Sequence, residues 1–468
     1  MSKRWWWAVL VTIGFGVVYS WKLGTSFNVD SDWARDIHDV IKITQGDISL
    51  IGPPLSAGAF AGPYYYYFLV PVFRITGLNE TAMVMFNAWV FAVALGVVMY
   101  VIYGRWGAKS WLAVSAWGLS PAWINAARHP GNAYSYLPLL VLSWVMVYFK
   151  QRWRAWEALA LGILLGIIAN YHPGALFAII PVVIFLLVKK MGWRQRWWWA
   201  VGMAGTLAPL VLFEMKNQFV ITKGIFIYKK FAAFTGGVPT IYLTLAKKNL
   251  WENMWFISDR MQKLLGINPI AYLVSGLIIV GRKRTWMVAA GTGWVLTIIG
   301  VRHIFEYHYL LPAAGLILTA WILGVAKNRF ATVILAGVIA IELVSFPGQL
   351  YQLATRPASQ FEKTVNTAVK RGWVNSQDSF NVIGIMEENH YVVSGNEYRF
   401  YLRKNGFKPL PVYDYQNADE LLIFSEVKDL NIEKLDMWET EQFGKSNLRE
   451  FEKTKIESIT AYRIKKLT

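Results

Sequence analysis

Residues 81–103 read TAMVMFNAWVFAVALGVVMYVIY and contain no charged side chain. About 20 consecutive apolar residues are enough for an α-helix to cross the hydrocarbon core of a bilayer. We therefore predict a membrane-spanning helix here. Further runs of the same kind bring the expected number of spans to about eleven; they cover roughly 5–22, 110–127, 132–149, 155–170, 174–189, 197–213, 267–281, 285–301, 308–325 and 329–346.

The overall composition agrees with a membrane protein. Of the 468 residues, 55% are hydrophobic and 16% are charged, whereas roughly a quarter of the residues of a soluble domain are charged. The mean hydropathy is +0.34. No single water-soluble core could cover so much apolar surface, which excludes a cytosolic enzyme and a disordered or fibrous chain. The absence of cysteine excludes disulfides and thiolate metal sites.

The net charge of +18 does not indicate a nucleic-acid partner, because the basic residues stand between apolar runs and form no DNA-binding motif. With the N-terminus inside, the short outer turns hold only Arg128 and Arg302. Basic residues are retained on the cytoplasmic side during insertion, so we predict an integral, multi-pass plasma (inner) membrane protein with its N-terminus cytoplasmic and its C-terminus extracytoplasmic. The basic residues of the expected cytoplasmic segments are Lys3, Arg4, Arg105, Lys109, Lys150, Arg152, Arg154, Lys189, Lys190, Arg194, Arg196, Arg282, Lys283, Arg284, Lys327 and Arg329.

The chain divides into two expected domains. We predict an all-α polytopic membrane domain over 1–349, with outer loops at 23–63 and 214–266, and a small extracytoplasmic α/β domain over 350–468. The expected elements of the second domain are strands at 381–385, 421–424 and 459–464 and a helix at 397–405 closed by Gly406. Outside the spans we expect an interfacial or re-entrant helix at 64–75 and amphipathic pieces at 226–234 and 251–265.

Polar residues gather on one side of the predicted bundle. Given the expected topology, those that interrupt the ends of apolar runs all fall on the outer face, whereas the inner face offers basic loops and tryptophans. Ionisable groups at membrane depth are costly and usually face a cavity, so the clustering predicts an outward-opening polar site. Its candidate residues are Asp30, Asp32, Arg35, Asp36, Arg128, His129, Asn132, Asn170, His172, Glu214, Asn217, Arg302, His303, Glu306, Tyr307 and His308.

Each candidate also has a purely structural interpretation. The three aspartates at 30, 32 and 36 are suited to the N-terminus of a helix. The two His-Pro-Gly tripeptides, at 129–131 and 172–174, are typical of a tight turn in which proline begins the next helix. Arg128 and Arg302 are suited to lipid headgroups, and Glu214 to a salt bridge. No single residue distinguishes the structural interpretation from a functional one. The convergence of all of them on one face favours a functional site.

A carboxylate beside an arginine at the outer edge of a helical bundle suits one chemistry in particular. The carboxylate can take the proton of an acceptor hydroxyl, while the guanidinium binds a leaving phosphate through two parallel hydrogen bonds. Transfer of a sugar from a lipid phosphate needs both functions.

The chain resembles the GT-C glycosyltransferases, in the branch related to protein O-mannosyltransferases and lipid A aminoarabinose transferases. The resemblance extends over residues 1–346 and includes Asp32-Trp33-Ala34-Arg35, which is similar to the family's Asp-Glu-x-Arg. The other similar stretches are Gly52-Pro53-Pro54, Gly62-Pro63-Tyr64, Ser120-Pro121, Asn170-Tyr171-His172-Pro173, Leu212–Asn217 and Tyr307-His308-Tyr309. Two departures stand out: Trp33 replaces the family's Glu, and Gly62-Pro63 replaces a second acid of the aminoarabinose branch.

The resemblance implies a GT-C membrane enzyme that takes a sugar from a polyprenyl phosphate on the outer face. It implies that Asp32 is the base that activates the acceptor, and that Arg35 binds the donor phosphate. Arg128 and Arg302 are further candidates for that phosphate. The expected substrate pocket includes Asp30, His172, Glu214, His303 and Tyr307, with Asp30 as the other candidate for the base.

The expected partners are a polyprenyl-phosphate-linked sugar, membrane lipids, and a lipid, glycan or protein acceptor. We expect no required cofactor. The acids and histidines of the outer face are nevertheless suitable ligands for a divalent cation, so a cation site is the alternative. A transporter or flippase of lipid-linked saccharides is the alternative, but paired repeats with helices broken at the midplane are not evident. A scaffold that presents the C-terminal domain would not account for Asp32 and Arg35 beside an apolar bundle.

Overall fold

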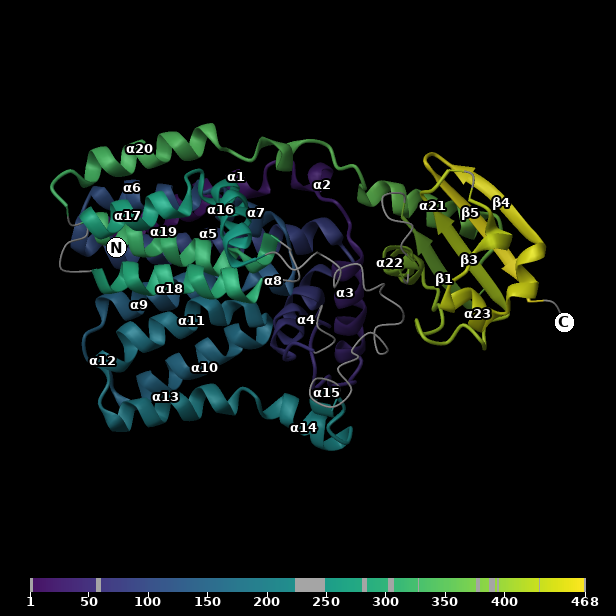
Figure 1. The fold of residues 1–468 in the computed structure, drawn as a ribbon. Helices are drawn as coiled ribbons and strands as arrows, with labels where there is room; N and C mark the ends of the chain where they lie inside the picture. The colour runs from purple at the N-terminus through teal and green to yellow at the C-terminus, as the bar shows by residue number, and fades with distance from the viewer. Residues whose placement is uncertain are drawn as a thin grey trace.

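The computed structural model describes residues 3–55, 60–223, 249–279, 284–301, 307–326, 328–375, 379–386, 392–393, 395–428 and 430–466. Helices form an elongated body, and a small domain with a β-sheet lies at one end of it (Figure 1). The predicted combination of a helical bundle and a small C-terminal α/β domain is confirmed. The expected piece at 226–234 lies outside the described residues.

Apolar sequence produces most of the helices of the body, because a helix satisfies its own backbone hydrogen bonds in a bilayer. They are α1 (Lys3–Ser20), α2 (Leu23–Ser26), α3 (Ser31–Thr44), α4 (Tyr64–Thr76), α5 (Glu80–Trp106), α6 (Lys109–Gly118), α7 (Pro121–Arg128), α8 (Asn132–Ser135), α9 (Leu137–Phe149), α10 (Ala155–Tyr171), η1 (Pro173–Ala175), α11 (Leu176–Val182), η2 (Val183–Leu187), α12 (Val188–Lys190), α13 (Trp193–Gly205), α14 (Ala208–Lys216), α15 (Val220–Lys223), α16 (Leu250–Leu265), α17 (Pro269–Ile279), α18 (Arg284–Gly300), η7 (Tyr307–Tyr309), α19 (Leu311–Val325), α20 (Ala331–Val344) and η8 (Gly348–Tyr351).

The described helices differ from the expected spans in length. Four are long and apolar enough to cross a membrane, or up to six if each of two bent pairs is one span. The two pairs are α13 with α14, bent by 44°, and α16 with α17, bent by 74°. Three shorter apolar helices, α10, α19 and α20, accompany them. The count of eleven spans therefore stays a prediction.

The run expected at 110–127 is two helices and not one. α6 ends at Gly118, and the Ser120 hydroxyl oxygen accepts a hydrogen bond from the Trp123 backbone N–H, 3.3 Å away, at the start of α7. Pro121 has no N–H to continue the hydrogen bonding of α6 and suits the first turn of a new helix. A serine cap followed by proline therefore divides the apolar run.

Basic residues from distant parts of the chain meet at one end of the body. The space beside Gly104 is filled by the Arg4 guanidinium, and the Arg105 guanidinium lies 4.4 Å from the centre of the Phe149 ring. Lys190 Nζ donates to the Lys150 carbonyl at 3.0 Å. The N-terminus lies at the end of the body away from the sheet domain, and the C-terminus lies beyond that domain (Figure 1).

The C-terminal domain contains a five-stranded sheet in the order β2-β1-β3-β5-β4, in which β1 and β3 are parallel and the other neighbours are antiparallel. Its first core, between the sheet and helices α21 and α22, includes Val382, Leu422 and Phe424 and is continuous with the core of the helical body. Its second core, on the other face, includes Ile383 and Phe443. The elements are α21 (Ala358–Lys370), β1 (Phe380–Ile385), β2 (Val392–Val393), α22 (Asn396–Lys404), β3 (Glu420–Ser425), η9 (Ile432–Lys434), α23 (Trp438–Phe443), η10 (Lys445–Arg449), β4 (Phe451–Ile456) and β5 (Ile459–Lys465).

Candidate active site

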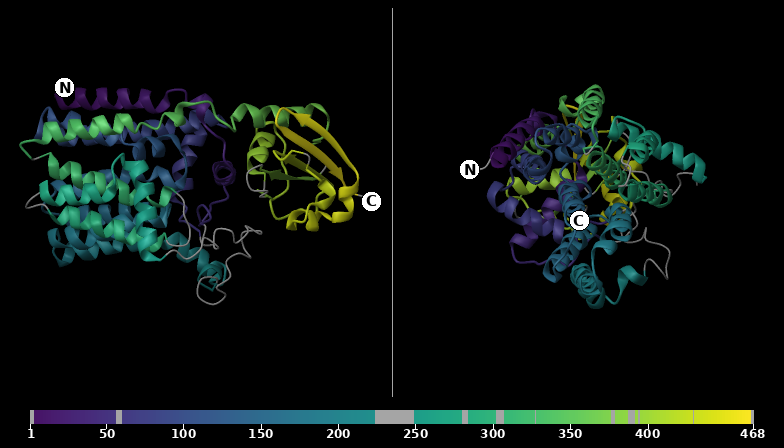
Figure 2. Two further views of the ribbon diagram at one scale, coloured as in Figure 1. Left: turned by 45° about the horizontal axis from the view of Figure 1, so that its top comes forward. Right: turned by 90° about the vertical axis from the view of Figure 1, so that its left-hand side faces the viewer.

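The helix that carries the predicted catalytic aspartate, α3, lies between the helical body and the C-terminal domain (Figures 1 and 2). Its first residue is preceded by Asp30, whose backbone is extended and whose carboxylate accepts the Trp33 N–H at 2.8 Å. This is an N-cap, and it satisfies one of the free N–H groups of the first turn. The structural interpretation of Asp30 as a helix-terminal acid therefore accounts for its position.

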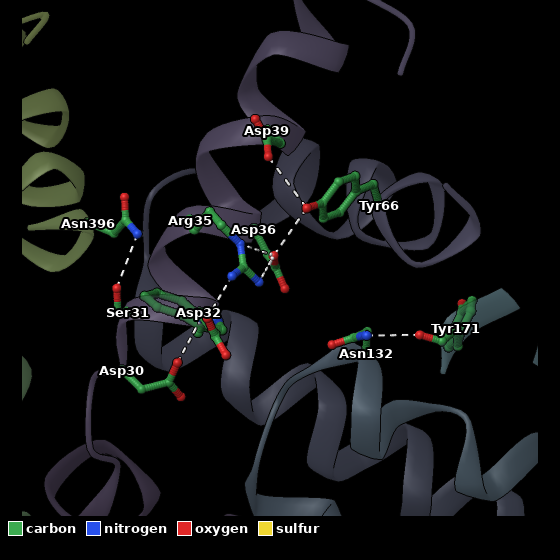
Figure 3. A network of polar contacts seen from close by, with 11 residues as sticks. Asp30, Ser31, Asp32, Arg35, Asp36, Asp39, Tyr66, Asn132, Tyr171 and Asn396 are labelled. Atoms are coloured by element: carbon green, nitrogen blue, oxygen red, sulfur yellow. Dashed lines mark hydrogen bonds and ion pairs between the residues drawn. The ribbon is translucent and has the colours of Figure 1, made fainter. Parts of the chain in front are cut away.

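An ion-pair triad stands on the first two turns of α3 (Figure 3). Arg35 Nη1 lies 2.6 Å from Asp32 Oδ1, and Arg35 Nη2 lies 2.8 Å from Asp36 Oδ1. Arg35 Nε donates to the same Asp36 oxygen at 3.1 Å. The Asp32–Arg35 contact has the i,i+3 spacing that brings two side chains together on a helix. Two carboxylates on one guanidinium leave the triad with a formal charge of −1.

The two carboxylates of the triad have opposite environments. The side chain of Asp32 is 82% exposed, whereas that of Asp36 is 2% exposed. Asp36 also accepts the Tyr66 hydroxyl at 3.2 Å. Burial raises the pKa of Asp36 to about 7, although the Arg35 guanidinium favours its ionised form. Asp32 is thus the carboxylate that a substrate can reach, and Asp36 is the one that holds Arg35 in place.

The sequence suggested Asp36 as one more acid of the helix N-terminus, whereas the structure shows it buried and paired with Arg35. Its buried environment includes Tyr66, which the sequence suggested only as part of an interfacial or re-entrant helix at 64–75. The one available signal was the acidic pair at 32 and 36, whose i,i+4 spacing places both on the side of Arg35.

The loop before α4 is attached to the C-terminal end of α10. The Gly62 N–H donates to the Asn170 carbonyl at 2.8 Å, and a Cβ atom at Gly62 would collide with the Asn170 side chain. The Gly52 N–H donates to the Ala61 carbonyl at 2.8 Å, which closes the loop on itself. Glycine is therefore required at 52 and 62 because the loop backbone approaches itself and α10 closely. These contacts position the start of α4, which directly follows Pro63.

The two His-Pro-Gly turns meet beside this loop. Asn132 Nδ2, just after the first turn, donates to the Tyr171 carbonyl at 2.8 Å, just before the second (Figure 3). The buried His172 accepts the Gly174 N–H through Nδ1 at 3.1 Å, and its ring lies 4.9 Å from that of His308. The structural interpretation of 172–174 as a turn in which proline begins the next helix is confirmed, and it places an aromatic group at the C-terminal end of α10.

Tyr65 is a residue of this region that the sequence did not single out. It is buried on α4, its ring lies 5.7 Å from that of Tyr171, and its hydroxyl is buried with no hydrogen-bond partner among the described residues. A buried hydroxyl without a partner is costly. Its position between Tyr171 and the acids of α3 makes it a candidate contact for a bound polar group.

Arg128 and Glu214 are engaged in contacts within the protein. Arg128 is buried, and its guanidinium donates to the carbonyls of Tyr19, Trp21 and Leu350 at 2.6, 3.0 and 2.9 Å. It also donates to the Ser26 hydroxyl at 2.5 Å. Glu214 accepts the N–H groups of Ile221 and Thr222 at 2.9 and 2.8 Å. These contacts tie chain segments together: the Arg128 guanidinium is not free to bind a phosphate as it stands, and the Glu214 carboxylate is engaged by the backbone that follows α14.

Of the remaining candidates, His129 Nδ1 lies 2.8 Å from the Asn125 carbonyl oxygen, Asn217 Nδ2 donates to the Phe213 carbonyl at 2.8 Å, and Glu306 lies outside the described residues. Arg302 and His303 lie outside the described residues, and Tyr307 begins the short helix η7. In the part of the chain that the structure describes, no group of three or more His, Asp or Glu side chains is arranged to hold a metal ion. The involvement of a divalent cation therefore stays an open hypothesis.

No protein-family model matches the sequence, and no curated protein matches it. Solved structures do match. ArnT from Cupriavidus metallidurans bound to undecaprenyl phosphate gives a TM-score of 0.62 at 10% identity, over 99% of this chain and 98% of that chain. ArnT in the apo state gives 0.61 at 12% identity, over 97% of both chains. The chain has the ArnT fold.

This likeness confirms the resemblance to GT-C glycosyltransferases at the level of the fold. The arabinofuranosyltransferase AftD from mycobacteria matches as well, with a TM-score of 0.54 at 10% identity, over 99% of this chain and 40% of that chain. The match to ArnT includes the C-terminal domain, since it extends over nearly the whole of both chains. At these identities the likeness to ArnT concerns the fold, and the roles of single residues stay predictions.

Proposed function

We propose that the protein is an integral membrane glycosyltransferase that moves a sugar from a polyprenyl-phosphate donor to an acceptor on the extracytoplasmic face. The observation that carries the proposal is the triad of Asp32, Arg35 and Asp36 at the end of the helical body. The fold supports it, because one ArnT structure with this fold is bound to undecaprenyl phosphate.

In the proposed reaction Asp32 accepts the proton of an acceptor hydroxyl. The acceptor oxygen forms a bond to the anomeric carbon of the sugar, and the bond from that carbon to the phosphate oxygen breaks. The electron pair leaves with the phosphate, whose growing negative charge Arg35 stabilises. The configuration at the anomeric carbon is inverted. Arg35 reaches the phosphate with N–H groups that its two carboxylate partners do not use.

The expected topology indicates on which side of the membrane the site lies. The basic cluster around Arg4 and Arg105 lies at one end of the body and supports a cytoplasmic side there. α3 and the C-terminal domain lie at the other end (Figure 1). We therefore place the site and the C-terminus outside the cytoplasm, with about eleven membrane crossings between the termini.

The proposal is tested with purified protein in liposomes and a panel of radiolabelled polyprenyl-phosphate sugars. Transfer of label to a lipid, glycan or protein acceptor, with release of the polyprenyl phosphate, supports a glycosyltransferase. Movement of intact donor across the bilayer without cleavage would instead favour the transporter alternative. The Asp32→Asn variant is the matched control, because it removes the base and keeps the shape of the side chain.

A further inference from the structure

Trp33, which stands where the resembling family has Glu, is a buried contact between two domains. Its side chain is 2% exposed, and its ring lies 5.2 Å from that of Phe400 on α22 and 5.6 Å from that of Phe27. The neighbouring Asp32 points to solvent. One face of α3 thus carries the triad, and another face is held by the C-terminal domain.

Polar contacts reinforce the same junction. Asn396 Nδ2, at the first residue of α22, donates to the Ser31 hydroxyl at 3.1 Å, at the first residue of α3 (Figure 3). At the far end of α22, Lys404 Nζ lies 3.3 Å from Glu80 Oε2, which opens α5 of the body. α22 therefore bridges α3 and the helical body.

The chain that leads into α3 is paired with the chain that leads into the C-terminal domain. The Val29 N–H donates to the Arg356 carbonyl at 3.1 Å, and the Arg356 N–H donates to Asn28 Oδ1 at 2.9 Å. The Arg356 guanidinium continues into the domain, where it lies 3.0 Å from Glu397 and 2.9 Å from Glu426. Arg356 thus connects the entry to α3 with α22, through Glu397, and with the residue that directly follows β3, Glu426.

We propose that the C-terminal domain sets the position of the triad, with Phe400 and Asn396 as positioning residues that act through Trp33 and Ser31. The inference rests on the proposed function of the triad. α3 is a single helix between two loops, and its packing partners are α4 on the body and α22 on the domain. Without α22, α3 keeps its helical shape but loses one of the two surfaces that fix its direction. Because a displacement of about 1 Å can cost roughly a hundred-fold in rate, this contact matters for catalysis.

The first test compares Phe400→Ala with Phe443→Ala. Both remove a buried ring from the C-terminal domain, but Phe443 belongs to the second core and does not face α3. We expect Phe400→Ala to lower kcat roughly ten- to a hundred-fold and to raise the donor KM, since Asp32 and Arg35 move together. Phe443→Ala should lower the thermal midpoint and leave kcat and KM unchanged. Phe400→Leu, which keeps an apolar contact with Trp33, should restore most of the activity.

The split between kcat and KM separates positioning from instability, because partial unfolding lowers the apparent kcat and leaves KM alone. Equal loss in both alanine variants, or wild-type kinetics of Phe400→Ala, would overturn the inference.

The second test does not need activity and uses the absence of cysteine from the chain. Spin labels at Lys42→Cys on α3 and at Ala108→Cys, just before α6, report the distance between α3 and the body. We expect a narrow distance distribution in the otherwise wild-type protein, a broad one with Phe400→Ala, and a narrow one with Phe443→Ala. An unchanged distribution with Phe400→Ala contradicts the inference whatever the activity. If Phe400→Ala broadens the distribution but the wild-type protein transfers no sugar, the positioning of α3 by the C-terminal domain is supported and the proposed function is refuted.

Discussion

Arg35 Nη2 lies 2.8 Å from Oδ1 of Asp36, the next residue along the chain, and this buried carboxylate offsets the positive charge of the guanidinium. The arginine that the sequence suggests as a free phosphate ligand is therefore already paired on both sides. Its pairing with the buried Asp36 should make the affinity for a donor depend on the charge of that carboxylate, and this dependence can be measured.

Asp32→Asn should abolish sugar transfer and leave the protein folded with its donor binding largely intact. Asparagine keeps the shape of the side chain but cannot accept the proton, and loss of a general base costs about 10²–10⁴-fold in rate. Initial rates with saturating donor measure the effect. The matched control is Asp39→Asn on the same helix, which loses a 3.0 Å ion pair with Lys42 and keeps an amide oxygen that can still accept the Tyr66 hydroxyl, 3.4 Å from Asp39 Oδ2. Near wild-type turnover of Asp32→Asn would move the base elsewhere.

Arg35→Ala should weaken donor binding roughly ten- to a hundred-fold, because a charge-assisted hydrogen bond to a phosphate contributes about 1.5–3 kcal/mol. Arg35→Lys should recover part of the affinity, since lysine keeps the charge but lacks the planar pair of donors. Equilibrium binding of a labelled polyprenyl-phosphate sugar reports the change. The exposed Arg74 at the end of α4 provides the control, and its alanine variant should bind donor as the wild type does.

Donor affinity should rise as the pH falls through about 7. Burial raises the pKa of Asp36 to about 7, so the carboxyl is ionised above this pH and neutral below it. Protonation removes one of the two negative charges on Arg35 and makes the guanidinium more available to a phosphate. A phosphodiester donor keeps its single charge over this range. Binding measured between pH 6 and pH 8 should show a several-fold change.

Asp36→Asn carries a neutral group at all pH values, and it should therefore bind donor tightly at pH 8 and lose the pH dependence. A variant that retains the wild-type pH profile would assign the titration to a different group.

Arg128→Ala should destabilise the fold and leave the intrinsic donor affinity unchanged, which is the reverse of the Arg35→Ala pattern. The substitution leaves the carbonyls of Tyr19, Trp21 and Leu350 without the guanidinium, and each unsatisfied buried group costs about 1–3 kcal/mol. The thermal unfolding midpoint and the donor dissociation constant of the folded fraction are the two measurements. Weakened binding at an unchanged midpoint would restore Arg128 as a phosphate ligand.

A reporter that is active only outside the cytoplasm should be active when fused after Thr468. The prediction follows from the concentration of basic residues in the expected inner segments, which are retained in the cytoplasm during insertion. The matched control is the same fusion with a reporter that is active only in the cytoplasm. Activity of this second fusion alone would reverse the topology and move α3 to the cytoplasmic side.

The sequence by itself determined the class of the fold, because apolar runs and turn residues act locally. A charge-free run such as 81–103 can satisfy its backbone in a bilayer only as a helix, and α5 is that helix. Asp30, followed by an amphipathic segment, starts α3 through a hydrogen bond three residues away. The i,i+3 contact between Asp32 and Arg35 follows from the geometry of the helix alone.

Only the tertiary structure decided which polar residues are free to act. The buried environment of Asp36 depends on Tyr66 of another helix, and the inward position of Arg128 depends on the carbonyls of Tyr19 and Leu350, which are far apart in the chain. Trp33 and Phe400 meet through the packing of two domains. Such contacts join residues that are far apart in the chain, and a local pattern of residue types does not specify them. Burial and charge pairing are set by these distant partners, and they determine which of the predicted site residues can reach a substrate.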